Sequence, residues 1–266
     1  MEAHRRARLL RVLDLEVWTS RAAASDLPVE VPMAVETPVL PVARSPRPVV
    51  APIRPAAPPL PGLLPEAPAP AAAAAPPYVA PADWAGLAEA VKTCTRCKLC
   101  KTRTNTVFGI GPQDAPLLVI GEGPGAEEDA RGEPFVGAAG KLLDEMLKSV
   151  DRSRSRNVYI ANVVKCRPPG NRDPESDEVA ACRPFLDRQI ELLKPKLILA
   201  LGRIAAQRLL SSSAPLSKLR GPQHAYGPAN TPVLISYHPA YLLRTPSDKL
   251  KSWVDLKQVH RFLAKV

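Results

Sequence analysis

Five cysteines carry the most specific chemical signal in this sequence. The N-terminal residues do not resemble a secretory signal, so we expect reduced thiols that bind a metal rather than form disulfides. A C-x2-C pair is followed, much further along the chain, by two dispersed thiols with C-x15-C spacing. A zinc ribbon usually closes with a second C-x2-C pair, whereas the ligands of iron–sulfur clusters often come from separate loops. The spacing therefore favours an iron–sulfur cluster over zinc, with Cys100 as a small apolar filler beside Cys94, Cys97, Cys166 and Cys182.

Three further motifs carry polar and aromatic residues, and each lies at the end of an apolar run. They read GEGPGAEEDARGEPFVG at 121–137, NVVKCRPPGNR at 162–172 and HPAYLLR at 238–244. The first is rich in glycine but lacks the spacing of dinucleotide- and phosphate-binding loops. We expect its glycines to let the backbone approach a flat ligand instead.

The elements that must position these motifs follow from hydrophobic patterning. Continuous apolar runs that alternate with helical patterns indicate a parallel sheet covered by helices on both faces. The predicted fold is therefore a three-layer α/β/α domain with a central, mainly parallel, four-stranded sheet. Ligands of such folds bind beyond the carboxyl ends of the strands, where the three motifs lie. The predicted strands are 117–121, 158–164, 197–202 and 232–237, and the predicted helices are 138–150, 175–194 and 203–211.

The segment 1–81 has a different composition from the rest of the chain. Seventeen of the 32 prolines lie between Pro28 and Pro81, and such a segment buries too little apolar surface to offset the entropy of ordering. We predict a short amphipathic helix at 1–21, a disordered Pro/Ala-rich linker at 22–81 and a catalytic domain at 82–266. The helix is expected to fold onto a protein partner or onto the catalytic domain, and the proline-rich linker is a candidate ligand for a proline-binding module. The apolar stretch at 1–21 is too short and too charged to span a membrane.

The charge indicates a polyanionic partner. The chain carries a net charge of +10, and residues 82–266 contain 28 Lys and Arg against 19 Asp and Glu. A folded basic domain is typical of nucleic-acid binding, although a basic protein without such a partner is the plainer alternative. We expect no membrane association and a cytoplasmic protein.

Taken together, these motifs resemble the family 4 uracil-DNA glycosylases, the iron–sulfur branch of the uracil-DNA glycosylase superfamily. The resemblance covers about residues 86–262 and rests on CTRCKLC, GEGPG…EDARGEPFVG, NVVKCRPPGNR and YHPAYLLR, in that order. It implies a DNA repair enzyme that hydrolyses the N-glycosidic bond of uracil in single- or double-stranded DNA, the first step of base excision repair. It also implies a bacterial-type, monomeric enzyme with a [4Fe-4S] cluster. The implied cluster ligands are Cys94, Cys97, Cys166 and Cys182.

The resemblance assigns roles to three residues that suit the physics of uracil excision. The base must leave the helix and enter a pocket that reads its edge. Phe135 is expected to stack on the flipped ring, and Asn162 to pair with uracil O4 and N3–H. Cytosine presents the opposite hydrogen-bonding pattern. His238 is expected to donate a hydrogen bond to O2 as negative charge develops on the leaving uracil.

The group that orients the attacking water is less sharply indicated. In the best-known family of the superfamily a GQDPY motif supplies an aspartate and a tyrosine, and the matching positions here are Gly123 and Gly125. Glu122 is the first candidate for this role and Glu128 is the second. With glycine at position 125, the exclusion of thymine must come from another part of the pocket, such as Phe135.

Contacts to DNA are expected from the same edge of the sheet. Leu242, four residues after His238, matches the leucine that fills the gap left by the flipped base. Arg167, Arg172 and Arg244 are candidates for phosphate contacts, with solvated surface arginines as the plainer interpretation. The loop CRPPGNRDPESDE contains no histidine, so we expect turnover without a covalent trap and without lyase activity.

Two other classes of function fit parts of this pattern. A nucleic-acid-binding module that kept the fold and cluster without catalysis would not need the three pocket residues together. An iron–sulfur electron carrier would not need basic loops at the strand ends and would favour a second cluster motif, which is missing.

Overall fold

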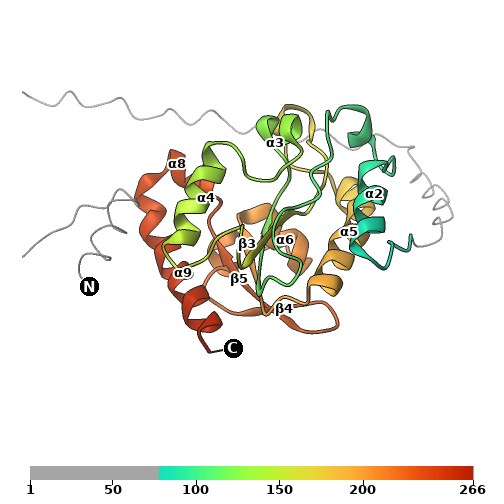
Figure 1. Cartoon of the computed structure of the whole chain (residues 1–266). Helices are drawn as coiled ribbons and strands as arrows, with labels where there is room; N and C mark the ends of the chain where they lie inside the picture. Colours follow the sequence, from blue (N-terminus) through green and yellow to red (C-terminus); the bar gives the residue numbers. More distant parts are fainter. Residues whose placement is uncertain (1–77, 266) are drawn as a thin grey trace, which may run out of the picture. The chain divides into compact units, whose positions relative to one another are not determined.

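The computed structural model describes residues 78–265, drawn in colour in Figure 1. The predicted N-terminal helix, and residues 22–77 of the predicted linker, lie outside the described residues. The last four linker positions are described and contact the domain. The ring of Tyr78 lies 5.3 Å from the ring of Phe185, and Ala80 is buried.

The sheet has five strands in the order β2-β1-β3-β5-β4. Strands β2, β1, β3 and β5 pair in parallel, and the edge strand β4 pairs with β5 in the antiparallel direction. The predicted number of four strands is therefore wrong by one edge strand. The missed strand, β4, has three residues and only one of them is buried, so it lacks the apolar run on which strand prediction depends. The strands are β1 (Leu117–Gly121), β2 (Val158–Asn162), β3 (Leu197–Leu201), β4 (His224–Tyr226) and β5 (Thr231–Ser236).

The register of the sheet brings the predicted motifs to one edge. Gly121 at the end of β1 pairs with Asn162 at the end of β2. The apolar run predicted as a strand to position 164 continues this pairing, because the backbone N–H groups of Val163 and Val164 donate to the carbonyls of Gly121 and Glu122. The first two motifs therefore begin side by side.

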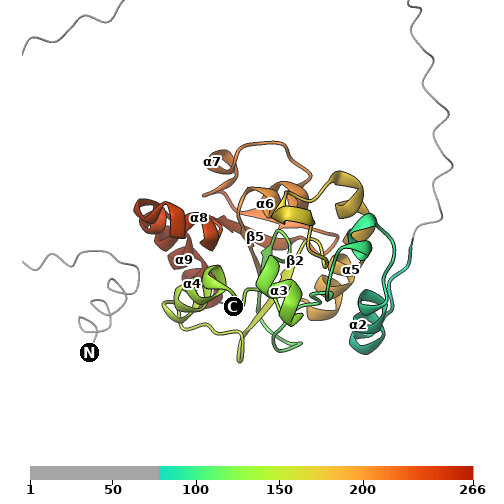
Figure 2. The same ribbon diagram turned by 90° about the horizontal axis from the view of Figure 1, so that it is seen from above.

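Helices cover both faces of the sheet, which confirms the predicted three-layer α/β/α class. Alternate residues of β1 face opposite sides, as the pleat requires: Leu118 and Ile120 belong to one hydrophobic cluster, Leu117 and Val119 to the other. Helices α2, α5, α6 and α7 contribute to the first cluster, and α4, α8 and α9 to the second, an arrangement visible in Figures 1 and 2. The helices are α2 (Trp84–Lys92), α3 (Ala126–Arg131), α4 (Ala138–Lys148), α5 (Ser176–Leu193), α6 (Arg203–Leu210), α7 (Leu216–Leu219), α8 (Pro239–Arg244) and α9 (Lys249–Leu263), with 3-10 turns η1 (Lys98–Lys101), η2 (Pro169–Asn171) and η3 (Pro246–Asp248).

The three predicted helices are confirmed to within a few residues at their ends, as α4, α5 and α6. Helix α5 contains Pro184 at its ninth position, and it still runs for five turns because packing on the sheet outweighs the single lost hydrogen bond. Within the described residues, no helix combines the length and hydrophobicity that crossing a bilayer requires.

Candidate active site and cysteine cavity

A cavity of about 450 Å³ opens at the carboxyl edge of the sheet. Segments that follow β1, β2 and β5 line it, as the fold class predicts. The structure brings together all of the residues that the sequence assigns to base binding and catalysis. These are Glu122, Gly123, Gly125, Glu128, Phe135, Asn162 and His238.

Asn162 ends β2 and turns its amide into a nearly dry part of this cavity. The residue is 1% exposed, and its side-chain oxygen has no hydrogen-bond partner among the described residues. A Cβ atom on Gly121 would lie 2.4 Å from this oxygen and 2.7 Å from the ring of Phe135, so only glycine allows the three groups to meet. A buried acceptor without a donor costs about 1–3 kcal/mol, and a ligand that supplies an N–H group would remove that cost.

Phe135 adopts a backbone conformation that is rare for a bulky residue. Its φ is 54°, in the left-handed region, where strain of about 1–3 kcal/mol is held by the surrounding structure. The ring is buried and lies 5.5 Å from the imidazole of His238, tilted by 31°. This strained backbone conformation therefore places the ring of Phe135 in the cavity, beside His238.

Arg154 holds that strained segment and was not singled out by the sequence. Its guanidinium donates to the carbonyls of Pro134 and Phe135 at 3.0 and 2.8 Å and pairs with Asp144 on α4 at 2.8 Å. No local motif marks such a residue, because its three partners come from two separate segments further back in the chain. Arg154 thus positions the aromatic ring without touching the cavity.

His238 caps α8, and this contact fixes the tautomer of its ring. Nδ1 accepts a hydrogen bond from the backbone N–H of Ala240 at 3.2 Å, which leaves the proton on Nε2 in the neutral form. Burial, assisted by the charge of Arg244, lowers the pKa of His238 to about 4. At neutral pH the cavity therefore holds an uncharged imidazole with one N–H donor.

Glu122 lies at the same edge, next to a second carboxylate. Burial, followed by the charge of Asp173 and a hydrogen bond with it, raises the pKa of Glu122 to about 7. Asp173 also lines the cavity, and its carboxylate pairs with Arg203 at 2.8 Å. Neither Asp173 nor Arg203 was among the predicted site residues, because the contact joins segments that are distant in the sequence.

Glu128, the second candidate for orienting water, braces the glycine-rich loop. Its carboxylate accepts hydrogen bonds from the backbone N–H groups of Gly125, Val136 and Gly137 at 3.2, 2.9 and 3.1 Å. A Cβ atom on Gly125 would lie 2.7 Å from this carboxylate. With its oxygens engaged by three donors, Glu128 is better suited to shape the loop than to accept a proton.

The structure corrects the prediction for Leu242. This residue is 1% exposed and packs in the core with residues of α4 and α9, so it is not a free wedge. The next residue, Leu243, is 45% exposed. Helix α8 has only six residues, too few for hydrophobic periodicity to tell the buried leucine from the exposed one.

The three predicted phosphate-binding arginines have different surroundings. Arg172 forms a two-pronged ion pair with the buried Glu178, at 2.8 and 2.6 Å. Arg167 donates to the side chain of Asn171 at 2.7 Å. Arg244 is exposed at the rim of the cavity. Pairing with Glu178 leaves Arg172 least suited to meet a phosphate.

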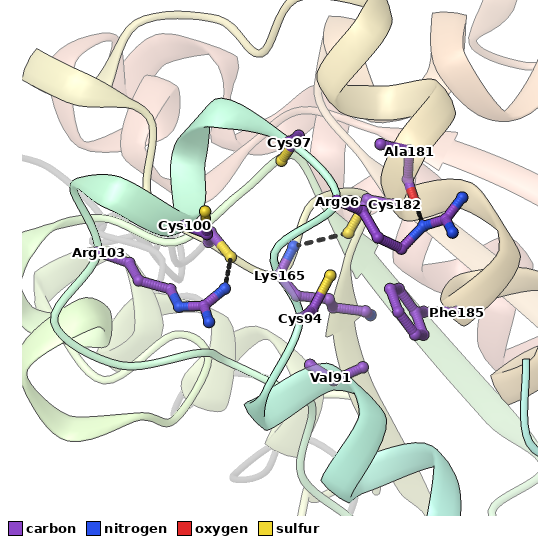
Figure 3. A pocket seen from close by; sticks show the side chains of 11 residues that line it. Val91, Cys94, Arg96, Cys97, Cys100, Arg103, Lys165, Ala181, Cys182 and Phe185 are labelled. Carbon is purple, nitrogen blue, oxygen red and sulfur yellow. Dashed lines mark hydrogen bonds between the residues drawn. The ribbon is translucent and has the colours of Figure 1, made fainter. Parts of the chain in front are cut away.

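The cysteines line a second cavity (Figure 3), which shares no lining residue with the first. Cys94 follows α2, Cys97 and Cys100 lie at η1, Cys166 follows β2, and Cys182 lies in α5. Cys100, predicted as a filler, lines this cavity with the other four. In the described part of the chain no three His, Cys, Asp or Glu side chains lie close enough to hold a single metal ion.

Arg96, Arg103 and Lys165 also line this cavity, and the described residues place no carboxylate against Arg103 or Lys165. Arg103 donates to the sulfur of Cys166 at 3.1 Å. Lys165 is fully buried, and its ammonium group donates to the carbonyl of Asn162 at 2.9 Å and to the side chain of Gln189 at 2.6 Å. Burial raises the pKa of Cys97, Cys166 and Cys182. A buried cation normally has an anionic partner, and thiolates bound to a metal would supply one.

The family model and three relatives that match this chain belong to one superfamily. Residues 108–257 match the family model described as the uracil DNA glycosylase superfamily. The chain is 44% identical over 183 residues to a type-4 uracil-DNA glycosylase of Thermotoga maritima. The aligned region covers 67% of this chain and 94% of the relative. Two other proteins of that name are each 42% identical to it. The alignment with the protein from Archaeoglobus fulgidus covers 66% of this chain and 90% of that protein. The alignment with the protein from Sulfurisphaera tokodaii covers 64% of this chain and 80% of that protein.

Proposed function

Since the chain belongs to the type-4 branch of the uracil-DNA glycosylase superfamily, we propose that it removes uracil from DNA and leaves an abasic site. The observation that carries this proposal is the meeting of Phe135, Asn162 and His238 around one cavity, each from a different strand-end segment. The reaction is the first step of base excision repair. Single- and double-stranded DNA are both proposed substrates.

The cavity suits recognition of a flipped uracil. The base stacks on Phe135, and its N3–H donates to the side-chain oxygen of Asn162, which has no partner among the residues that the structure describes. The amide N–H group of Asn162 donates to O4. Cytosine lacks the N3 proton and would leave the buried oxygen unpaired, at a cost of about 1–3 kcal/mol.

His238 is proposed to stabilise the leaving group. When the bond between C1′ and N1 breaks, its electron pair passes to the uracil ring and charge develops on O2. A neutral imidazole with its proton on Nε2 donates to that oxygen. Loss of such a donor typically lowers kcat by about 10²–10³-fold.

Glu122 is proposed to orient the water. The water oxygen forms the new bond to C1′, and one of its protons passes to the Glu122 carboxylate. The sugar cation is already strongly electrophilic, so a base with a pKa near 7 suffices. No lysine lines the described cavity, which supports hydrolysis without lyase chemistry.

We further propose that Cys94, Cys97, Cys166 and Cys182 hold a [4Fe-4S] cluster. Four thiols around one cavity suit such a group, and the cluster with its thiolates would be the anion that Arg103 and Lys165 face. The cluster would tie the η1 segment, the loop after β2 and helix α5 together. Iron and sulfide analysis of protein purified without oxygen tests this assignment against zinc.

The exposed leucine beside the cavity, Leu243, is proposed as the residue that fills the gap left by the flipped base. Arg244 and Arg167 are the proposed phosphate contacts. We propose residues 82–266 as the catalytic domain of a cytoplasmic monomer, and a protein partner for the N-terminal segment.

One assay tests the proposed function. Purified full-length protein is incubated with single- and double-stranded oligonucleotides that contain one uracil, and alkali then cleaves any abasic site. We expect cleavage at the uracil position with the wild-type protein and about 10²–10³-fold slower cleavage with His238→Ala. Binding without cleavage would instead identify a DNA-binding module.

A further inference from the structure

Two carboxylates meet at the rim of the substrate cavity. Glu122 follows β1 and Asp173 follows η2, and both line the cavity. Their side chains lie close enough to form a hydrogen bond when one carboxyl group is protonated. Two carboxyl groups form such a contact only when one of them holds a proton, because two negative charges at this separation repel. Asp173 therefore favours the protonated form of Glu122, whose pKa is raised to about 7 by burial and by this neighbour.

Arg203 decides which member of the pair carries that proton. It is the first residue of α6, directly after β3, and its guanidinium lies 2.8 Å from the Asp173 carboxylate. The cation stabilises negative charge on Asp173, whereas Glu122 is the more buried member. Glu122 is therefore the member that binds the proton as the pH falls below about 7, and its O–H group then donates to Asp173.

We propose that Asp173, held by Arg203, is a positioning residue that sets when Glu122 can take the proton of the attacking water. This inference rests on the proposed function and deepens it. With Glu122 ionised, water donates one proton to it and bonds to C1′, while the electrons of the broken bond leave with uracil. With Glu122 protonated, its O–H group points to Asp173 and the water has no acceptor.

The other charged groups around Glu122 give the expected direction of each change. Arg203 and Arg208, both on α6, lower the pKa of Glu122, whereas burial and Asp173 raise it to about 7. Arg172, Arg244, Glu128 and His238 line the same cavity. His238 stays neutral above pH 6, since its pKa is about 4, so it adds no second step near neutral pH.

The test is a pH profile of uracil excision under single-turnover conditions with enzyme in excess, from pH 5 to 9. The wild-type rate should rise by about tenfold for each pH unit below 7 and then level off. Asp173→Asn removes the repelling charge, so the rising limb should move to lower pH by about one unit. Arg203→Gln removes a cation and should move the limb to higher pH.

Asp177→Asn is the matched control. Asp177 is an exposed acid four residues from Asp173, and it faces Lys98 rather than the cavity. The rising limb of the pH profile of Asp177→Asn should stay at the wild-type pH. A general loss of stability would lower the plateau of a variant without moving its limb.

The outcomes separate this inference from the proposed function. If no uracil is released at any pH by the wild-type protein, the proposed function fails. If uracil is released but the wild-type profile is flat, or if neither Asp173→Asn nor Arg203→Gln moves the limb, the carboxylate-pair inference is overturned and the proposed function stands. If Asp173→Asn does not fold, Arg203→Gln decides alone: an upward shift supports the inference and an unmoved limb overturns it.

Discussion

The two cavities of this protein are built in opposite ways. The cavity at the sheet edge is wide and contains polar groups that can still form hydrogen bonds: the amide oxygen of Asn162 and the N–H of His238. The cysteine cavity is narrow, and basic residues face its thiols. Polar groups without partners suit a ligand that enters and leaves, whereas thiols from three separate segments suit a group that stays bound.

One short segment joins the two cavities. Asn162 lines the cavity at the sheet edge, and Cys166, four residues later, lines the cysteine cavity. Between them, the ammonium group of Lys165 bonds to the carbonyl of Asn162 and lies near the thiols of Cys166 and Cys182. Since each cavity has its own set of side chains, damage to one should leave the main property of the other intact.

The largest effect is expected from loss of a cluster ligand. Cys166→Ala should lower the iron content from about four atoms per chain to near zero, because the remaining thiols cannot complete the cluster. We also expect lower folding yield and weaker DNA affinity before any change in preference for uracil. Iron analysis and fluorescence anisotropy with labelled DNA measure both.

Cys100→Ala is the control for that variant, since Cys100 lines the same cavity outside the proposed ligand set. It should retain iron. Loss of iron in this control, or iron retained in Cys166→Ala, would contradict the ligand assignment.

The next effect lies in the other cavity. His238→Ala should reduce the single-turnover rate by about 10²–10³-fold and leave the iron content unchanged, because the leaving uracil loses its hydrogen-bond donor. His260→Ala, whose ring contacts the carbonyl of Val150 away from the substrate cavity, should keep the wild-type rate. Equal loss in both variants would show that the effect of His238 is structural.

A smaller and more selective effect is expected for Asn162→Ala. Removal of the amide should lower kcat/KM for uracil by about 10- to 100-fold, the equivalent of about 1–3 kcal/mol. Asn171→Ala changes an asparagine that lines the same cavity but bonds to Arg167, and it should lose far less. If the two variants behave alike, Asn162 does not read the base.

The smallest catalytic effect is expected for the leucine pair on α8. Leu243→Ala should slow excision from double-stranded DNA only, and should change the free energy of unfolding by no more than about 0.5 kcal/mol. Leu242→Ala should instead lower the free energy of unfolding by about 2–5 kcal/mol, because it empties a core position. Denaturant unfolding and excision from both substrates distinguish them, and a reversed pattern would restore Leu242 as the wedge.

The sequence predicted the parts of this protein that depend on local pattern. Continuous apolar runs located four strands, and β1 was predicted with its observed bounds. The motifs at the strand ends predicted that Asn162, Phe135 and His238 lie at one edge of the sheet, where they line one cavity, and the relatives confirm the resemblance that those motifs suggested. Such features depend on neighbours in the sequence and on one rule about parallel sheets.

The missed features depend on contacts between distant segments. Arg154 reaches back past the start of α4 to the carbonyl of Phe135, and Arg203 pairs with Asp173 across a still longer stretch of chain. The ion pair of Arg172 with Glu178 and the burial of Leu242 likewise follow from tertiary packing. These residue types are common on surfaces, so only the fold distinguishes them.

We propose that the cavity at the sheet edge excises uracil in particular. The most direct test of this proposal is a competition in which oligonucleotides with uracil, cytosine or thymine at one position share a tube with the full-length protein, and the released bases are identified by mass spectrometry. We expect free uracil alone, with its release slowed in His238→Ala and unchanged in His260→Ala. Release of cytosine at a comparable rate, or of no base at all, would contradict it.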